Sequence, residues 1–159
     1  MTNIYPGQYR ISRIQLINWG TFHGYFSIPV ARKGFLITGG SGSGKSTLLD
    51  AMSAVLVPQK DLKFNAASQQ DLGRHDGRNL VSYVRGAWRQ QENAQTGEIA
   101  PEYLRTGATN SIVALTYDNG AGKQHTLIAI FRLNGGENSV SQVKKPVSYT
   151  HLRAHETRH

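Results

Sequence analysis

The chain has 159 residues, a length suited to one ordinary domain, and its 38% of hydrophobic residues can fill a core, which excludes general disorder. It has no cysteine, which excludes a disulfide scaffold, a thiolate zinc site and cysteine catalysis; no apolar run reaches the ~18–20 residues of a membrane helix, so we expect a cytoplasmic protein with no membrane partner. Its 18 Lys and Arg against 10 Asp and Glu give a net charge of +8, which suits a polyanionic partner such as nucleic acid or nucleotide.

The amino-terminal part of the chain predicts strands. Residues 9–18 alternate polar and apolar side chains, which is typical of a strand with one buried face. A turn at 19–24 separates them from a second predicted strand at 25–30, so the two should form a hairpin. The short apolar run 34–38 (GFLIT) is typical of a strand that is covered on both faces.

A helix is predicted after the glycine- and serine-rich loop 39–44. Apolar side chains recur at helical spacing over residues 48–56, and Pro58 should end the helix. Residues 59–79 are polar and rich in turn formers, which indicates a long surface loop. Residues 80–89 could form a short second helix.

The second half of the chain predicts strands again. The β-rich runs 111–117 and 125–133 flank Asp118-Asn119-Gly120, which is a hairpin signal. The first run also resembles an apolar strand that ends in a magnesium-binding aspartate, but we interpret Asp118 as the first residue of the turn. Residues 133–137 (LNGGE) resemble the signature motif of ABC-type ATPases, yet they follow a strand instead of opening a helix, so we interpret them as a turn.

The motif that carries chemistry is the glycine-rich loop, which satisfies the P-loop pattern G-x-x-x-x-G-K-[ST] in full. Its glycines allow backbone N–H groups to surround phosphate oxygens, and the helix that follows adds the positive end of its dipole. Lys45 is placed to reach the β- and γ-phosphates as the catalytic cation, and Ser46 to hold Mg²⁺. The sequence therefore predicts a site for ATP and Mg²⁺ that consists of Gly39, Gly40, Ser41, Gly42, Ser43, Gly44, Lys45, Ser46 and Thr47.

The order RIQLINWGTF, a second strand, GFLITGGSGSGKSTLLDAM and SIVALTYDNG resembles the amino-terminal half of an SMC-type ATPase head. These heads share their core with ABC transporters and DNA-repair ATPases. The segments LKFNAA, SYVRGAW and YLRTG look like the MukB/MksB branch, closest to the ATPase of the Wadjet anti-plasmid system. The resemblance covers residues 9–136. It implies an α/β P-loop NTPase fold of the ABC/SMC type, of which residues 1–145 would form the amino-terminal lobe with a mixed sheet and an antiparallel β subdomain.

The resemblance also implies roles outside the P-loop. Asn18 and Trp19 match a loop near the nucleotide base, so Trp19 either stacks on adenine or, as an equally weighted alternative, packs in the core. Asp50 matches an acid common early in this helix, with no chemical role that we can assign. The Q-loop glutamine, signature motif, magnesium-binding Asp, catalytic Glu and coiled-coil arms of the family have no counterpart here. We therefore expect this piece to bind nucleotide without turning it over.

For the parent protein the resemblance implies an ATP-driven DNA motor. Its partners would be double-stranded DNA, a second copy of the head, and kleisin-type and nuclease subunits. Its role would be DNA loop extrusion in defence against plasmids or in chromosome organisation. Two alternatives remain open: another ABC-core ATPase, such as a transporter subunit or DNA-repair ATPase, and a small complete P-loop kinase that would need Asp118 as its metal ligand.

Three arginines form the candidate DNA surface. Arg78, Arg85 and Arg89 lie between the predicted helix and the strand 111–117, and no acid lies between Asp76 and Glu92. Each arginine that contacts phosphate would add to a salt-dependent, sequence-independent affinity. The alternative is a solvated loop with scattered charges, or Arg85 packed and paired inside the fold.

The last segment, 146–159, is expected to lie outside the domain. Its sequence PVSYTHLRAHETRH has no apolar periodicity and resembles a tail translated from adapter-derived DNA on unrelated proteins. We expect a non-native, disordered tail, with the native protein continuing beyond about residue 145. The alternative is a genuine histidine-rich tail that could bind metal.

Overall fold

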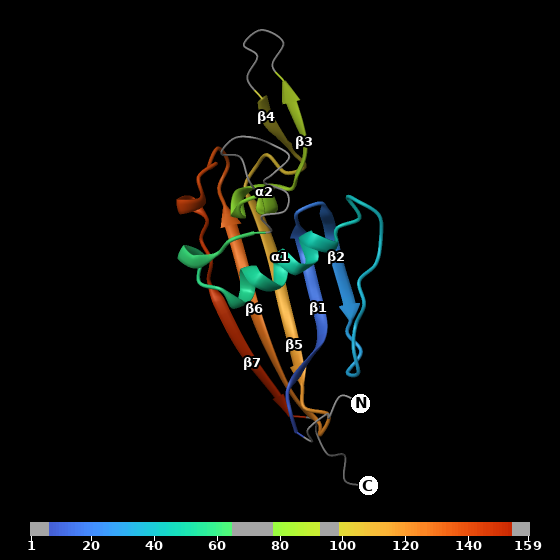
Figure 1. Cartoon of the computed structure of the whole chain (residues 1–159). Helices are drawn as coiled ribbons and strands as arrows, with labels where there is room; N and C mark the ends of the chain where they lie inside the picture. Colours follow the sequence, from blue (N-terminus) through green and yellow to red (C-terminus); the bar gives the residue numbers. More distant parts are fainter. Residues whose placement is uncertain (1–6, 65–77, 93–98, 154–159) are drawn as a thin grey trace.

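The computed structural model describes residues 7–64, 78–92 and 99–153, except for the side chains of 151–153. Its centre is a five-stranded sheet in the order β2-β1-β5-β6-β7, in which every pair of neighbours is antiparallel (Figure 1). The strands are β1 (Arg10–Trp19), β2 (Phe22–Pro29), β5 (Thr109–Asp118), β6 (Lys123–Leu133) and β7 (Val147–Arg153).

Both predicted hairpins of this sheet are confirmed. β1 pairs with β2, and β5 pairs with β6 along its whole length. In the β5–β6 turn the Asn119 side chain accepts hydrogen bonds from the N–H groups of Ala121 (2.9 Å) and Lys123 (3.1 Å). The Asp118 carboxylate accepts one from the Gly120 N–H (2.9 Å) and pairs with Arg32 at 3.0 Å. Asp118 is therefore a turn residue, as interpreted from the sequence.

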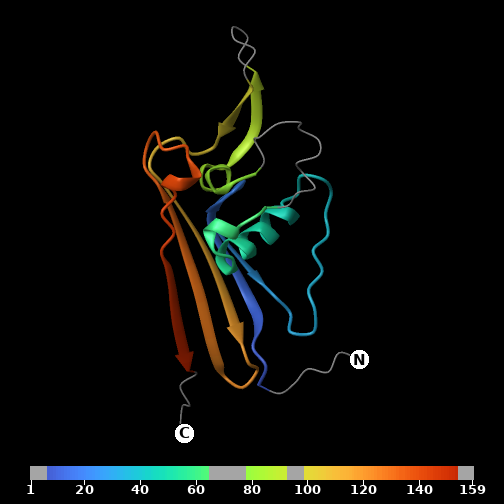
Figure 2. The ribbon, with the colours of Figure 1, turned by 60° about the vertical axis from the view of Figure 1, so that its left-hand side comes forward.

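Two helices cover one face of the sheet (Figure 2). They are α1 (Lys45–Leu56) and the short α2 (Leu80–Arg85). The apolar side chains of both helices pack against those of the central strands, which places one core between helices and sheet. Helices and strands thus share one core, as expected for a mixed α/β fold, but both helices lie on one face of an antiparallel sheet. The core includes Leu48, Ala51, Ala54 and Val55 of α1, Leu80, Val81 and Val84 of α2, and Ile14, Leu16, Val113, Leu115, Ala129 and Phe131 of the sheet.

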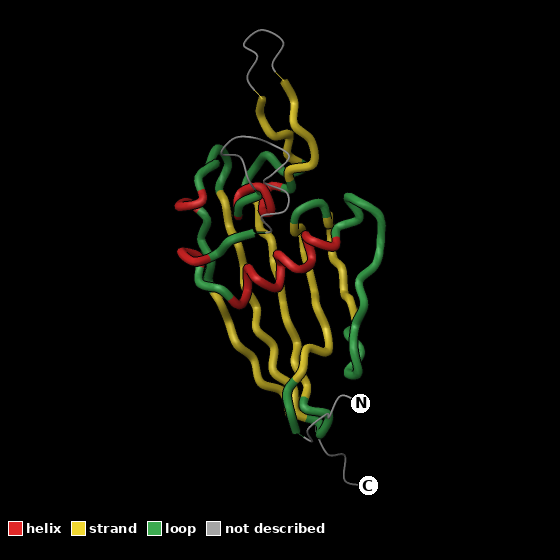
Figure 3. Tube along the Cα trace, viewed as in Figure 1, coloured by secondary structure: helices red, strands yellow, loops and turns green. Residues whose placement is uncertain are grey.

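The predicted strand 34–38 is wrong. This segment has no strand conformation, and it runs as a loop beside the sheet (Figure 3). Phe35 and Leu36 are 44% and 84% exposed. A strand buried on both faces needs layers that cover both faces, whereas residues 34–38 pair with neither edge strand of this sheet, β2 or β7. Among the described residues no parallel pairing exists, so the expected mixed sheet is antiparallel here.

The second predicted helix is shorter than expected, because Gly86 ends it. Gly86 has φ 68°, and a Cβ atom there would lie 2.6 Å from the Gly20 carbonyl oxygen. The chain then turns into the hairpin of β3 (Ala87–Glu92) and β4 (Ile99–Tyr103), which projects beyond the sheet (Figure 1). The predicted loop 59–79 contains one 3-10 turn, Gln59–Asp61, and its residues 65–77 lie outside the described part of the chain.

The expected disorder of the tail is wrong for Val147–Arg153. These residues form β7, which pairs with β6 from Ala129↔Val147 to Lys123↔Arg153. β6 offers this segment an unpaired edge, and Val147, Tyr149 and Thr150 are residue types that strands favour. Residues 154–159 lie outside the described residues, and the non-native origin of 146–159 stays a prediction.

Residues 133–137 form a turn, as interpreted. The Glu137 carboxylate accepts hydrogen bonds from the backbone N–H (2.6 Å) and the side-chain amide (3.0 Å) of Asn134. The backbone N–H bond is the main reason why the pKa of Glu137 lies below its ordinary value. No α-helix begins at this turn within the described chain, unlike the segment after an ABC signature motif.

Candidate functional site

The glycine loop leads directly into the first turn of α1. Positive φ angles occur at Gly39 (154°), Gly42 (77°) and Gly44 (90°), where side chains would be strained. At Gly44 a Cβ atom would also come within 3.0 Å of the Phe22 ring. No side chain caps α1, and its first turn carries no acid. The amino end of the helix can therefore direct its N–H groups and dipole at an anion.

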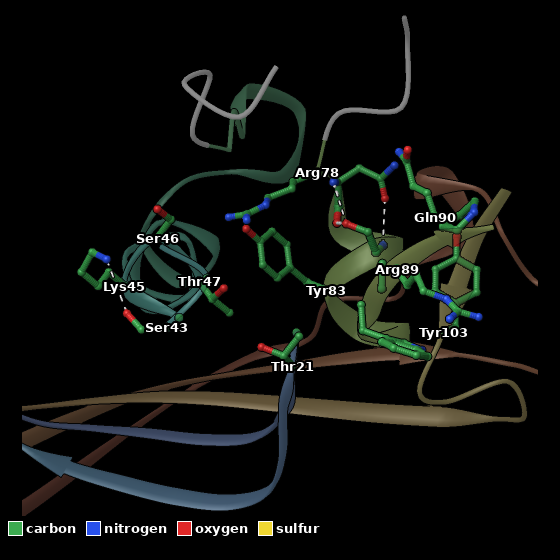
Figure 4. A pocket seen from close by; sticks show the side chains of 18 residues that line it. Thr21, Ser43, Lys45, Ser46, Thr47, Arg78, Tyr83, Arg89, Gln90 and Tyr103 are labelled. Atoms are coloured by element: carbon green, nitrogen blue, oxygen red, sulfur yellow. Dashed lines mark hydrogen bonds between the residues drawn. The ribbon is translucent and has the colours of Figure 1, made fainter. Parts of the chain in front are cut away.

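Lys45 is held over the loop. Its ammonium donates hydrogen bonds to the carbonyl oxygens of Gly39 (2.7 Å) and Gly40 (2.6 Å), and lies 3.4 Å from the Ser43 hydroxyl (Figure 4). The side chain is partly exposed. A cation in this position faces the space enclosed by the loop, where a phosphate oxygen could replace a carbonyl as its acceptor.

The first turn of α1 is fixed from below by an aromatic pair. The Trp19 indole N–H donates to the Thr47 carbonyl oxygen (3.0 Å). The Trp19 ring stacks on Tyr83, with centroids 4.8 Å apart and planes 1° from parallel. The Tyr83 hydroxyl in turn donates a hydrogen bond to the buried Asp50 carboxylate of α1. Three elements, β1, α1 and α2, are thus joined beneath the P-loop.

This network decides between the alternatives for Trp19. The side chain is 0% exposed, and one ring face is covered by Tyr83, so it cannot stack on adenine in this structure. The core-packing alternative holds. Asn18 is likewise occupied, since its side chain accepts a hydrogen bond from the Gly24 N–H (2.9 Å) within the β1–β2 hairpin.

Burial and the bond to Asp50 both affect the Tyr83 phenol. Burial raises the pKa of Tyr83 well above its ordinary value, and the hydrogen bond and negative charge of Asp50 raise it further. The nearby Arg78 opposes these effects, because its charge and hydrogen bond lower the pKa of Tyr83. The phenol therefore stays protonated at neutral pH and acts as a donor that secures Asp50.

A pocket of about 420 Å³ opens beside the P-loop, within the size range of small-molecule sites. One wall consists of Gly42–Thr47, and the floor includes Tyr83 and Thr21. The opposite wall belongs to the β3–β4 hairpin, which contributes Arg89, Gln90 and Tyr103 (Figure 4). The pocket therefore extends from the loop to an aromatic and polar surface.

Two of the three candidate DNA arginines line the pocket, and the third is buried in the fold. Arg78 lines the pocket, with its side chain beside Tyr83 (Figure 4). Arg89 is exposed on the hairpin and forms an ion pair with Glu102 at 2.9 Å. Arg85 is 1% exposed, so the expectation that it contacts DNA is wrong.

Arg85 instead holds loops together. Its guanidinium donates to backbone carbonyl oxygens of two segments, 105–107 and 134–137, including Thr106 (2.9 Å) and Glu137 (2.6 Å). Five donors in a fixed fork suit several carbonyls at once. Its position within the predicted helix 80–89 did not indicate this burial, although an arginine packed and paired inside the fold was the alternative.

Sequence reasoning missed Tyr83 and Trp88 as residues of the site. Tyr83 lies in SYVRGAW, which was used only for its resemblance. Trp88 lies two residues after Gly86, which ends α2, and it lines the pocket. A large aromatic side chain before the polar stretch that follows it was the available signal.

One residue of the site, Ser46, has a side chain suited to bind Mg²⁺. The Ser46 hydroxyl lies in the first turn of α1 at the pocket wall. Within the described residues no group of three or more His, Cys, Asp or Glu could hold a metal ion. Mg²⁺ beside a nucleotide takes few protein ligands, because phosphates and waters supply the remainder. A single hydroxyl is compatible with that role.

Comparison with known proteins supports a P-loop region. Residues 11–71 match the family described as the P-loop containing region of AAA domain. A segment of 59 residues, 37% of this chain, is 39% identical to the glutathione/L-cysteine transport system ATP-binding/permease protein CydD of Escherichia coli (strain K12). That segment spans 10% of the length of CydD. In the part of the chain that the structure describes, no helix is long and apolar enough to cross a membrane.

Proposed function

We propose that this chain binds the triphosphate of ATP at Gly39–Thr47, as the P-loop lobe, residues 1–145, of an ABC-core ATPase head. The observation that carries the proposal is the uncapped start of α1 directly behind a loop with three positive-φ glycines, at the wall of a pocket of nucleotide size. The match to P-loop regions over residues 11–71 supports it.

Each part of the loop has a physical task in this proposal. The backbone N–H groups of Gly42–Thr47 bind phosphate oxygens, and the α1 dipole favours the negative charge. Lys45 exchanges its bonds to the Gly39 and Gly40 carbonyls for the β- and γ-phosphates. Ser46 would hold Mg²⁺, which neutralises part of the charge on the phosphates.

Calorimetric titration with MgATP tests the proposal. We expect saturable binding by the wild-type chain and a loss of at least about tenfold in affinity for Lys45→Ala, since charge-assisted hydrogen bonds to the phosphates disappear. Lys60→Ala is the matched control, because Lys60 is exposed and outside the pocket. Equal affinities of the Lys45 and Lys60 variants would contradict the proposal.

For the parent protein we propose an SMC-like DNA motor, with ATP, duplex DNA, a second head, and kleisin-type and nuclease subunits as partners. The sequence resemblance over residues 9–136 supports this role in DNA loop extrusion, in plasmid defence or chromosome organisation. Arg78 and Arg89 remain the candidate DNA contacts. Replacing both with Gln should flatten the salt dependence of duplex binding by about 0.9 per lost phosphate contact. An unchanged slope would remove these residues from the DNA surface.

A second candidate is the ATP-binding part of a transporter, which the match to CydD favours. In that case the chain should bind MgATP with the same dependence on Lys45 and show no salt-dependent affinity for duplex DNA.

The small-kinase alternative loses its metal ligand. Asp118 lies in the β5–β6 turn, at the end of the sheet that is remote from α2, and pairs with Arg32 (Figure 1). We propose that the parent protein is an ATPase and that this piece alone has negligible turnover, because it supplies no catalytic Glu or signature donor to the phosphates.

A further inference from the structure

The pocket beside the P-loop has a second end, away from the loop that would hold the phosphates. It continues from Gly42–Thr47 to the β3–β4 hairpin, where Trp88, Arg89 and Tyr103 line it. If the triphosphate occupies the loop, the remainder of a nucleotide must leave it along the pocket. The remainder is a ribose and a planar base, which suits an aromatic surface with a few polar groups.

Trp88 offers that surface. Its side chain is 50% exposed, whereas Trp19 is fully buried. The Arg89 guanidinium lies 4.9 Å from the centroid of the Trp88 ring and is itself fixed by the ion pair with Glu102. A cation over one part of the ring restrains the indole, so that less freedom is lost when a base stacks on it.

The backbone explains why Trp88 turns toward the pocket. Ala87 pairs with Tyr103, and Arg89 pairs with the next residue, Glu102, so that Trp88 is the extra residue of a bulge in β3. A bulge redirects a side chain relative to the regular alternation of the strand, and bulges are enriched beside functional sites.

The hairpin is tied to the elements that hold the P-loop. The Leu104 N–H donates to the Gly86 carbonyl (3.0 Å), and the Arg105 guanidinium donates to the carbonyls of Val84 (2.8 Å) and Gly20 (2.8 Å). Through α2 and Tyr83 this anchor reaches α1. The two walls of the pocket are therefore positioned relative to each other within one packed unit.

We propose that Trp88 is the base-stacking residue of the nucleotide site, with Gln90, which lines the same pocket, to hydrogen-bond the base edge. This inference rests on the proposed function for the phosphate end of the pocket. It replaces Trp19 as the aromatic contact and assigns base recognition to the β3–β4 hairpin. The ligand class is a nucleoside triphosphate, held by its phosphates at one end and its base at the other.

The test compares MgATP with inorganic triphosphate, which has the phosphates and no base. Trp88→Ala should weaken ATP binding by about fivefold to 150-fold, the range for loss of one base–aromatic stack, and leave triphosphate binding unchanged. Trp88→Phe, which keeps an aromatic face, should retain most of the ATP affinity. ATP, and not triphosphate, should quench tryptophan emission of the wild-type chain and lose that effect in Trp88→Phe.

Tyr25→Ala is the control, because Tyr25 is a 60% exposed aromatic residue outside the pocket. If Trp88→Ala leaves the ratio of ATP to triphosphate affinity unchanged while Lys45→Ala abolishes both, the base subsite is overturned and the phosphate site stands. If triphosphate binding does not depend on Lys45, both proposals fail. If single-stranded DNA and not ATP quenches Trp88, the residue belongs to a nucleic-acid surface, and the subsite is overturned.

Discussion

The two flanks of the glycine loop are held in opposite ways. On the helix side, Thr47 is bonded to Trp19, and Asp50 to Tyr83, inside the core. On the side that precedes the loop, the apolar residues 34–38 do not form a strand, and Leu36 is 84% exposed. The helix flank is anchored in the core, whereas the preceding flank contacts the core through Ile37 and leaves Phe35 and Leu36 exposed.

This difference indicates which flank sets the geometry for phosphate binding. The loop runs directly into α1, and the Trp19 side chain fixes the first turn of that helix through its hydrogen bond to the Thr47 carbonyl oxygen. The apolar run 34–38 has the composition of a two-sided buried strand, but a strand of that kind needs layers that cover both of its faces. Substitutions on the two flanks should therefore have very different effects on stability.

The largest effect is expected for Trp19→Ala. Removing a fully buried indole that packs on Tyr83, Phe64 and Phe131 should lower the free energy of unfolding by about 3–5 kcal/mol. Urea unfolding followed by far-UV circular dichroism measures the change. Trp88→Ala is the matched control, with an expected change within about 0.5 kcal/mol, since its side chain is half exposed. If the two variants lost similar amounts of unfolding free energy, the contrast between the buried Trp19 and the exposed Trp88 would be refuted.

Tyr83→Phe should have an intermediate effect. The substitution keeps the ring on Trp19 and removes the hydroxyl that donates to Asp50. Because the buried Asp50 carboxyl group then lacks this donor, the free energy of unfolding should fall by about 1–3 kcal/mol. Chemical denaturation at pH 7 provides the measurement. A variant as stable as the wild type would show that the Tyr83–Asp50 bond does not secure α1.

The same bond predicts a loss of stability at alkaline pH. Because the pKa of Tyr83 is raised in the folded state, the unfolded chain releases the phenolic proton first, and stability should fall as the pH rises above about 10. The difference between wild type and Tyr83→Phe isolates this contribution from that of Tyr117, whose pKa burial also raises. The gap between the two proteins should shrink between pH 9 and about 11; a constant gap would contradict the raised pKa.

The smallest effect is expected on the exposed flank. Leu36→Ser should change the free energy of unfolding of this chain by less than about 0.5 kcal/mol, because the leucine is almost fully exposed. Thermal unfolding is sufficient for the comparison, with Leu48→Ser in the core as the destabilised reference. A large loss for Leu36→Ser would mean that residues 34–38 are packed in solution.

Local sequence signals predicted the parts of the fold that depend on local physics. The alternation in 9–18, the Asp118-Asn119-Gly120 turn and the helical spacing after Gly44 each act within a few residues, and all three are confirmed. The strand at 34–38 was wrong because its formation depends on partners that composition cannot supply. Tail residues 147–153 were expected to be disordered, yet the free edge of β6 accepts them as β7.

The candidate site likewise has one part that the sequence predicted and another that it did not. The loop Gly39–Thr47 is a contiguous motif, so its place before α1 could be predicted. The environments of Trp19 and Arg85 depend on segments far away in the chain, such as Tyr83 for the indole and the 134–137 turn for the guanidinium. No local sequence pattern distinguishes a tryptophan that packs in a core from one that stacks on a nucleotide base. The same holds for an arginine that donates to backbone carbonyls and one that contacts DNA.

Backbone NMR during a titration with MgATP tests the central account, in which a loop anchored by α1 binds the phosphates. The amide signals of Gly42–Thr47 should shift saturably, and in Lys45→Ala the same shifts should need at least about tenfold more MgATP. Signals of 34–38 should respond weakly by comparison. If MgATP leaves the Gly42–Thr47 amides unshifted while it shifts those of other segments, the P-loop is not the phosphate site of this chain.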